Sequence, residues 1–124
     1  MLSHKTNESQ EDYLECIFLI TQKKGFCRSI DVANKLEVAK ASVSVAVSKL
    51  QTSGYLRVDE DHMLRLTDSG ERLARRVYDK HKTLKEILVK AGVDPERAEL
   101  EACRMEHVIS DDSVSKLKAT IENK

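Results

Sequence analysis

The chain has 124 residues, enough for one domain or for two small domains that share a core. Its 21 basic and 21 acidic residues give a formal net charge of zero; with 40% hydrophobic and 34% charged residues it is too apolar for a disordered chain and too charged for a membrane protein. No apolar run approaches the roughly 18 residues that span a bilayer, and the first residues lack the apolar segment of a secretion signal. These features predict a cytoplasmic protein with no membrane partner.

The first half of the chain predicts three helices and a hairpin. We expect helices over about 9–23, from Ser29 to the break at 37–39, and over about 40–52, with Ser9 and Ser29 as N-caps. Two alternating stretches, 55–58 and 63–66, flank a polar turn and predict a β-hairpin. This order is that of a winged helix-turn-helix, in which the helix over 40–52 is the recognition helix.

The second half predicts three more helices. Thr67 is the expected N-cap of a long helix to about Ala91, and Asp94 followed by Pro95 begins the next, which runs to about Ile109. Residues 110–112 begin the last helix. We therefore predict a mainly α fold with a winged helix-turn-helix domain over 1–72 and a helical domain over 73–124.

The zero net charge hides an uneven distribution. Residues 23–57 hold seven basic and two acidic side chains, a local charge of +5, which leaves −5 for the remainder. A basic helix-turn-helix segment is typical of a protein that binds double-stranded DNA. Small and hydroxyl-bearing side chains on the recognition helix suit entry into a major groove. The expected DNA-binding residues are Arg28, Lys40, Ala41, Ser42, Ser44, Val45, Ser48, Lys49 and Arg57.

Potential metal ligands recur at helical spacing. Cys103, Glu106 and His107 stand at i, i+3 and i+4, so they project from one helical face. Thiolate, carboxylate and imidazole are all ligands of first-row transition metals. Asp12 and Glu15 form a similarly spaced acidic pair in the first helix. The candidate metal ligands are Asp12, Glu15, His81, Cys103, Glu106 and His107.

Taken together, these segments resemble the DtxR/MntR family of metal-dependent transcriptional repressors. The resemblance runs from about Ser9 to Ile121, and it leads us to expect the short, MntR-like architecture without the SH3-like domain of longer members. It implies a non-enzymatic homodimer, joined through its C-terminal helices, that binds a palindromic operator and represses metal-uptake genes when it holds Fe(II) or Mn(II). The matching segments are 11–15, 31–36, 41–44, 66–70, His81 and 101–110.

The same resemblance makes the expected metal site a hybrid. Five of the candidates fall on MntR-like ligand positions: Asp12, Glu15, His81, Glu106 and His107. Cys103 stands where MntR-like members usually have a Glu, and it matches the Cys of DtxR-like members. Lys85 and Glu99 replace two ligands of the DtxR-like ancillary site, which is expected to be altered or absent. Because thiolate favours softer ions than Mn(II), Cys103 favours Fe(II), whereas Asp12 favours Mn(II); one or two ions per chain are expected.

Two other functions are compatible with parts of the sequence. One is a winged-helix regulator that works without metal, and the other is a small di-metal helical oxidase. The oxidase is disfavoured because four-helix di-iron sites use paired Glu-x-x-His motifs and a hairpin has no place in them. The hairpin tip, 59–61, carries three carboxylates, so we expect the wing to pack against the domain and not to grip phosphates.

Overall fold

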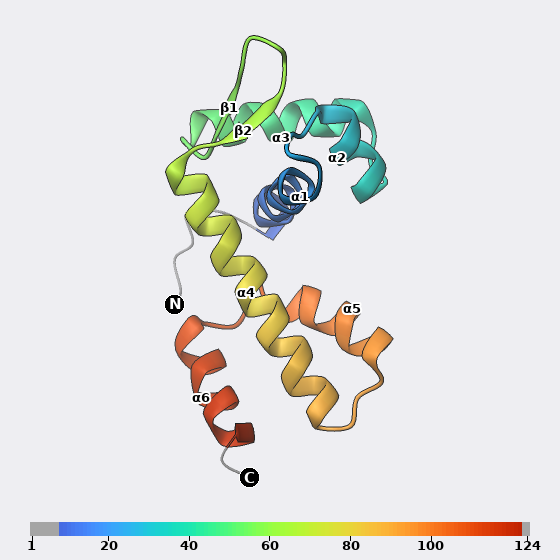
Figure 1. The fold of residues 1–124 in the computed structure, drawn as a ribbon, viewed down its shortest axis with the longest axis vertical. Helices are drawn as coiled ribbons and strands as arrows, with labels where there is room; N and C mark the ends of the chain where they lie inside the picture. The colour runs from blue at the N-terminus through green and yellow to red at the C-terminus, as the bar shows by residue number, and fades with distance from the viewer. Residues whose placement is uncertain (1–7, 123–124) are drawn as a thin grey trace. The chain divides into compact units, whose positions relative to one another are not determined.

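A computed structural model of the chain describes residues 8–122 (Figure 1). Within that range no helix has the length and apolar composition needed to cross a membrane. The described chain forms two compact units that divide between Arg75 and Arg76. The domain limits expected from the sequence, 1–72 and 73–124, stay a prediction. The elements are α1 (Glu8–Lys24), α2 (Ser29–Leu36), α3 (Lys40–Thr52), β1 (Leu56–Val58), β2 (Leu64–Leu66), α4 (Asp68–Lys90), α5 (Pro95–Met105) and α6 (Asp111–Glu122).

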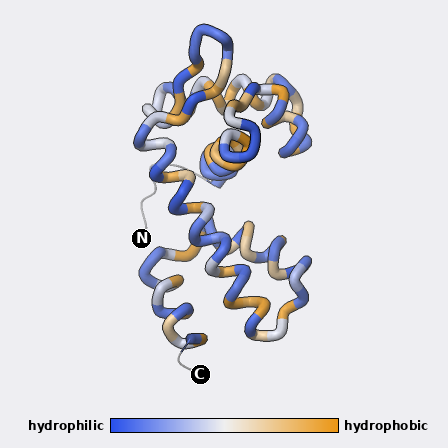
Figure 2. The backbone as a smooth tube through the Cα atoms, viewed as in Figure 1, coloured by the Kyte–Doolittle hydropathy of each residue, from blue (hydrophilic) through white to orange (hydrophobic). Residues whose placement is uncertain are grey.

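The first unit is built around α1, which packs against α2, α3 and β2. Leu14 and Ile17 of α1 are completely buried, and in Figure 2 the tube of this helix has hydrophobic as well as hydrophilic stretches. The apolar stripe predicted for α3 is confirmed, because Val43, Val47 and Leu50 are all buried. The buried side of α3 is thereby fixed against the core, and its opposite side faces solvent.

Both N-caps predicted for the first two helices are wrong. The helix α1 begins at Glu8, so Ser9 lies inside it, and α2 begins at Ser29 itself. Arg28 is the N-cap of α2, with an extended backbone, and its N–H donates to the Asp31 carboxylate at 3.0 Å. Asp31 also pairs with Lys24 at 2.9 Å. The Asp31 carboxylate, three residues into the helix, thus satisfies the N–H of the N-cap residue Arg28, as in a capping box, and Ser29 is the first residue of the helix.

The wing is a two-stranded antiparallel hairpin in which Leu56 lies opposite Leu66. Its loop is hydrophilic (Figure 2). Asp59 accepts hydrogen bonds from the N–H groups of Asp61 and Met63 and pairs with Arg65 at 2.9 Å. The Arg65 guanidinium beside Asp59 holds the pKa of that carboxyl below its usual range. One of the three tip carboxylates thus holds the turn together, while the expectation that the wing does not grip phosphates stays a prediction.

The second unit consists of the C-terminal part of α4 with α5 and α6, which flank it in Figure 1. Leu84, Ala102 and Val114 form its core, one residue from each helix. The caps predicted for the starts of α4 and α5 are confirmed: Thr67 accepts a hydrogen bond from Gly70 N–H, and Asp94 accepts one from Glu96 N–H. The helix α5 ends at Met105, four residues before the expected end near Ile109.

Candidate metal centre and nucleic-acid interface

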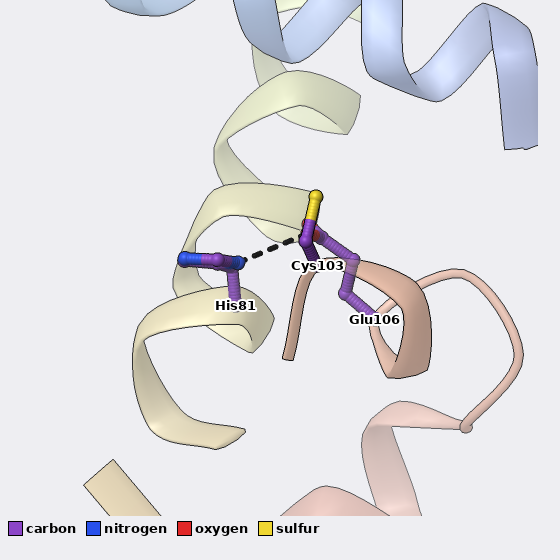
Figure 3. A group of neighbouring side chains, drawn as sticks. All are labelled: His81, Cys103 and Glu106. Carbon is purple, nitrogen blue, oxygen red and sulfur yellow. Dashed lines mark hydrogen bonds and ion pairs between the residues drawn. The ribbon is translucent and has the colours of Figure 1, made fainter. Parts of the chain in front are cut away.

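The second unit brings three of the predicted ligands together. His81 lies on α4, Cys103 on α5, and Glu106 directly follows α5 (Figure 3). Each offers one donor atom, and these three atoms all lie within 4.8 Å of one another. His81 precedes the other two residues by at least 22 positions in the sequence. Packing of Leu84 on α4 against Ala102 on α5 brings them together. The helix pair therefore creates the cluster.

Glu106 reaches the cluster although it lies beyond the last residue of α5. Its backbone keeps helical angles, φ −58° and ψ −25°, and its N–H donates to the carbonyl of Ala102 at 3.0 Å. The spacing of three residues from Cys103 thus still places both side chains on one face. The chain after Glu106 is anchored by Lys80, whose Nζ donates to the carbonyl of Ile109 at 2.9 Å.

The carboxylate of Glu106 is completely buried. Its Oε1 lies 3.1 Å from Nδ1 of His81, and its Oε2 has no hydrogen-bond partner among the described residues. A buried oxygen without a partner costs about 1–3 kcal/mol, and more if it is charged. A cation beside it would remove that cost, and thiolate, imidazole and carboxylate together suit a first-row divalent ion. The residues present therefore fit a metal.

A second carboxylate contacts the other side of the His81 ring. Nε2 of His81 lies 2.7 Å from Oε2 of Glu99, and Lys85 Nζ lies 3.0 Å from Oε1 of the same carboxylate. Partial burial acts to raise the pKa of Glu99, but the Lys85 ammonium and the His81 ring outweigh it and hold this pKa below its usual range. The candidate ligand set from the sequence omitted Glu99 and Lys85. Their spacing was available as a signal, since Glu99 stands four residues before Cys103 and Lys85 four after His81.

The remaining predicted ligands lie elsewhere in the chain. Asp12 and Glu15 are one turn apart on α1, in the first unit, and both are partly exposed. His107 lies in the turn that follows α5 in the second unit. The assignment of these three residues as ligands stays a prediction.

The other two cysteines belong to the core of the first unit. Cys16 and Cys27 are buried, whereas Cys103 is exposed, and all three are free thiols. Burial raises the pKa of Cys16 to about 11 and that of Cys27 to about 12. Both thiols therefore stay protonated at neutral pH and act as small apolar side chains.

The predicted DNA-binding residues are all on the surface of the first unit. Val45 is 56% exposed, which is unusual for a valine in a helix whose other side is buried. Together with Ala41 and Ser42 it lines a groove of about 520 Å³. The exposed set is Arg28, Lys40, Ala41, Ser42, Ser44, Val45, Ser48, Lys49 and Arg57.

Comparisons with known proteins match both halves of the chain. Residues 5–64 match the family described as "Iron dependent repressor, N-terminal DNA binding domain". Residues 67–123 match "Iron dependent repressor, metal binding and dimerisation domain". Together the two families account for nearly the whole chain, in the order expected for a DNA-binding part followed by a metal-binding part.

Individual relatives agree with these matches. The transcriptional regulator MntR of Lysinibacillus sphaericus is 35% identical over 114 residues, which cover 92% of this chain and 82% of that protein. The crystal structure of IdeR from T. acidophilum has a TM-score of 0.77 at 29% identity and covers 98% of this chain and 56% of that one. A manganese-dependent transcriptional repressor in complex with manganese has a TM-score of 0.80 at 26% identity, over 91% of this chain and 52% of that one.

The chain thus spans about half the length of these two solved proteins. Its winged helix-turn-helix, its helical second unit and its matches over both halves give one consistent assignment. The di-metal oxidase alternative finds no support among these relatives, which are regulators. The chain belongs to the DtxR/MntR family of metal-dependent transcriptional regulators, whose members are not enzymes.

Proposed function

We propose that this protein is a metal-activated, DNA-binding repressor of metal-uptake genes. The observation that carries the proposal is the fully buried Oε2 of Glu106, which lies beside His81 and Cys103 and has no hydrogen-bond partner within residues 8–122. A buried carboxylate in that state is costly to the fold, so its presence there is best accounted for by a cation that binds it. A basic surface on α3, in the other unit, supplies the DNA-binding side of the function.

His81, Cys103 and Glu106 are the ligands that the geometry supports directly. The family resemblance adds Asp12, Glu15 and His107. A bound divalent ion supplies positive charge that neutralises the carboxylates and the thiolate. Operator affinity rises with metal only if the DNA-competent conformation of the chain has the more complete ligand set.

The choice of metal follows from Cys103. Mn(II) prefers oxygen and imidazole ligands, and a thiolate favours softer ions. The family description names iron, and one solved relative is a manganese complex. We favour Fe(II) on account of the thiolate, with Mn(II) as the second candidate and one or two ions per chain.

A homodimer is the expected assembly, with a palindromic operator as its target. Four large apolar side chains of the second unit are well exposed in the single chain. Leu100 and Val108 are each 70% exposed, which is costly unless another surface covers them. We expect dimerisation to cover part of this set: Val89, Leu100, Val108 and Leu117.

Removal of the Cys103 thiol tests the proposed function. An operator is first selected from random duplexes by the wild-type protein with Fe(II) under anaerobic conditions. Metal is expected to raise wild-type operator affinity about 5- to 150-fold, the usual range of coupling between two sites. Cys103→Ala is expected to lose most of this gain for Fe(II) and Co(II) and less of it for Mn(II), because only the softer ions depend on sulfur. Fluorescence anisotropy titrations measure both affinities.

Arg104→Ala is the matched control, since it truncates the exposed neighbour of Cys103 and should keep the full metal response. Equal operator affinity of the wild type with and without every divalent metal would overturn the proposal. That result would favour the metal-independent winged-helix regulator instead.

Val45 gives a separate test of the DNA-binding surface. An exposed valine on a recognition helix can contact the 5-methyl group of thymine in the major groove. In the selected operator, uracil is placed where the thymine contacted by Val45 stands, which removes that methyl group. Wild-type affinity is expected to fall about fourfold, which corresponds to about 0.8 kcal/mol for one buried carbon. Val45→Ala should bind the thymine and uracil operators equally.

Val93→Ala makes the same change on a partly exposed valine of the second unit, outside the surface expected to dimerise, and should keep the preference for thymine. A thymine preference of equal size in the Val45→Ala variant would remove Val45 from the base-reading surface. The comparison is a double-mutant cycle, so it isolates the contact between one side chain and one methyl group.

A further inference from the structure

The ion pair between Lys85 and Glu99 lies on the side of His81 that faces away from Glu106. The His81 ring is clamped at both nitrogens: Nδ1 lies 3.1 Å from Glu106 and Nε2 lies 2.7 Å from Glu99. The His81 side chain is 11% exposed, whereas that of Glu99 is 51% exposed. Glu99 is therefore a surface carboxylate that reaches inward to a buried ring.

We propose that Glu99, held in place by Lys85, is a positioning residue for the metal ligand His81. The proposal rests on the proposed metal function and extends it to two residues outside the ligand set. A ligating histidine usually donates its second ring N–H to a carboxylate or carbonyl, which fixes the ring orientation and the nitrogen that stays available as a donor. Here the carboxylate of Glu99 accepts from Nε2, which turns Nδ1 toward Glu106 and Cys103.

Lys85 has its own part in this arrangement. Its ammonium lies 3.0 Å from Oε1 of Glu99, while Oε2 contacts the ring, so the two oxygens of one carboxylate have separate partners. Lys85 and His81 are one turn apart on α4, and Glu99 comes from α5. The lysine thereby holds the carboxylate in the orientation in which Oε2 reaches Nε2.

The variants that test the proposal differ in what they leave at position 99. Glu99→Leu removes the acceptor, and Glu99→Gln keeps an acceptor oxygen without the charge. Lys85→Met removes the ammonium and leaves the carboxylate. Glu101→Leu removes one exposed carboxylate from the same helix and is the matched control. Because Glu99 and Lys85 are each partly exposed, these changes leave the core of the second unit intact.

Metal affinity of the full-length protein is measured with Co(II) by competition with a chelator, under anaerobic conditions. Glu99→Leu is expected to bind about 10- to 100-fold more weakly, the usual effect of losing such a partner. Glu99→Gln should recover most of this loss, Lys85→Met should lie between them, and Glu101→Leu should match the wild type. The nitrogen-15 chemical shifts of the His81 ring in the metal-free protein supply a second readout. These shifts should change in Glu99→Leu and stay as in the wild type in Glu99→Gln and Glu101→Leu.

The thiolate-to-cobalt absorption band separates the existence of the metal site from the positioning role of Glu99. A band in the wild type that disappears in Cys103→Ala and persists in Glu99→Leu confirms the site, and the affinities then decide the role of Glu99. Wild-type affinity in Glu99→Leu, with the band present, would overturn the positioning role and leave the metal site standing. Absence of the band from the wild type would overturn the Cys103 site and the positioning role with it.

Discussion

Replacing Glu106 by leucine is expected to stabilise the metal-free protein and to abolish its response to metal. The substitution removes a fully buried oxygen that has no partner in the described part of the chain, an arrangement that costs the fold about 1–3 kcal/mol. It also buries a leucine side chain, worth about 1.5–3 kcal/mol, which offsets the lost contact with His81. His81 keeps Glu99 at 2.7 Å, so its ring is not left without a partner. The net gain expected in the free energy of unfolding is about 1–3 kcal/mol.

Urea unfolding in the presence of a chelator measures this gain, at one fixed protein concentration because a dimer unfolds in a concentration-dependent way. Metal at 100 times its dissociation constant should add about 2.7 kcal/mol to the wild type and almost nothing to Glu106→Leu. Glu106→Gln is the control, because it keeps the shape and one acceptor oxygen. It should lose the response to metal without the gain in the metal-free state. A metal-free Glu106→Leu protein less stable than the wild type would contradict the cost assigned to the buried oxygen.

The second large effect is expected at Gly70, in the first turn of α4. A Cβ added there would overlap the carbonyl oxygen of Tyr55 and lie 2.9 Å from its carbonyl carbon. That carbonyl also accepts a hydrogen bond from Thr67 N–H, so it cannot move without loss of the contact at the start of α4. Helix propensity alone would make Gly70→Ala stabilising by about 1 kcal/mol. The backbone clash should dominate and lower the free energy of unfolding by about 3 kcal/mol.

Gly54→Ala separates this clash from the ordinary cost of replacing a glycine. Gly54 has a φ of +81° and open space around the position of an added Cβ, so only backbone strain of about 1–2 kcal/mol is expected. Chemical denaturation, together with operator binding as a measure of the first unit, compares the two variants. A Gly70→Ala protein as stable as Gly54→Ala would mean that the junction of β1 and α4 yields easily.

The sequence predicted the order and nature of the elements well, and it placed their ends less well. The periodic apolar residues of α3 and the Asp94 and Thr67 caps are local signals, and all are confirmed. The cap at Ser9 failed because α1 already begins at Glu8, and the cap at Ser29 failed because Arg28 is the N-cap of α2 and its N–H is satisfied by Asp31. The sequence also placed the end of α5 four residues too late, near Ile109. The regular helix stops at Met105, and helical backbone angles persist at Glu106.

Some features of the candidate site could be predicted from the sequence and others could not. Ligand types at i, i+3 and i+4 were readable along the chain, so Cys103 and Glu106 were predicted as neighbours. Spacing could not indicate that Glu106 is completely buried or that Glu99 contacts His81, because both depend on how α5 packs on α4. Glu99 looked like any exposed acidic residue of a charged helix.

By itself the sequence determined the helical class, the basic segment over 23–57 and the set of chemical groups able to bind metal. These properties depend on residue type and on spacing within one element. Only the tertiary structure decided which of those groups share a site and what each costs the fold. His81 and Glu106 are 25 residues apart in the chain, and the packing of Leu84, Ala102 and Val114 brings them to 3.1 Å. That packing excludes water from one carboxylate oxygen, and desolvation of this kind has no signature in a linear pattern.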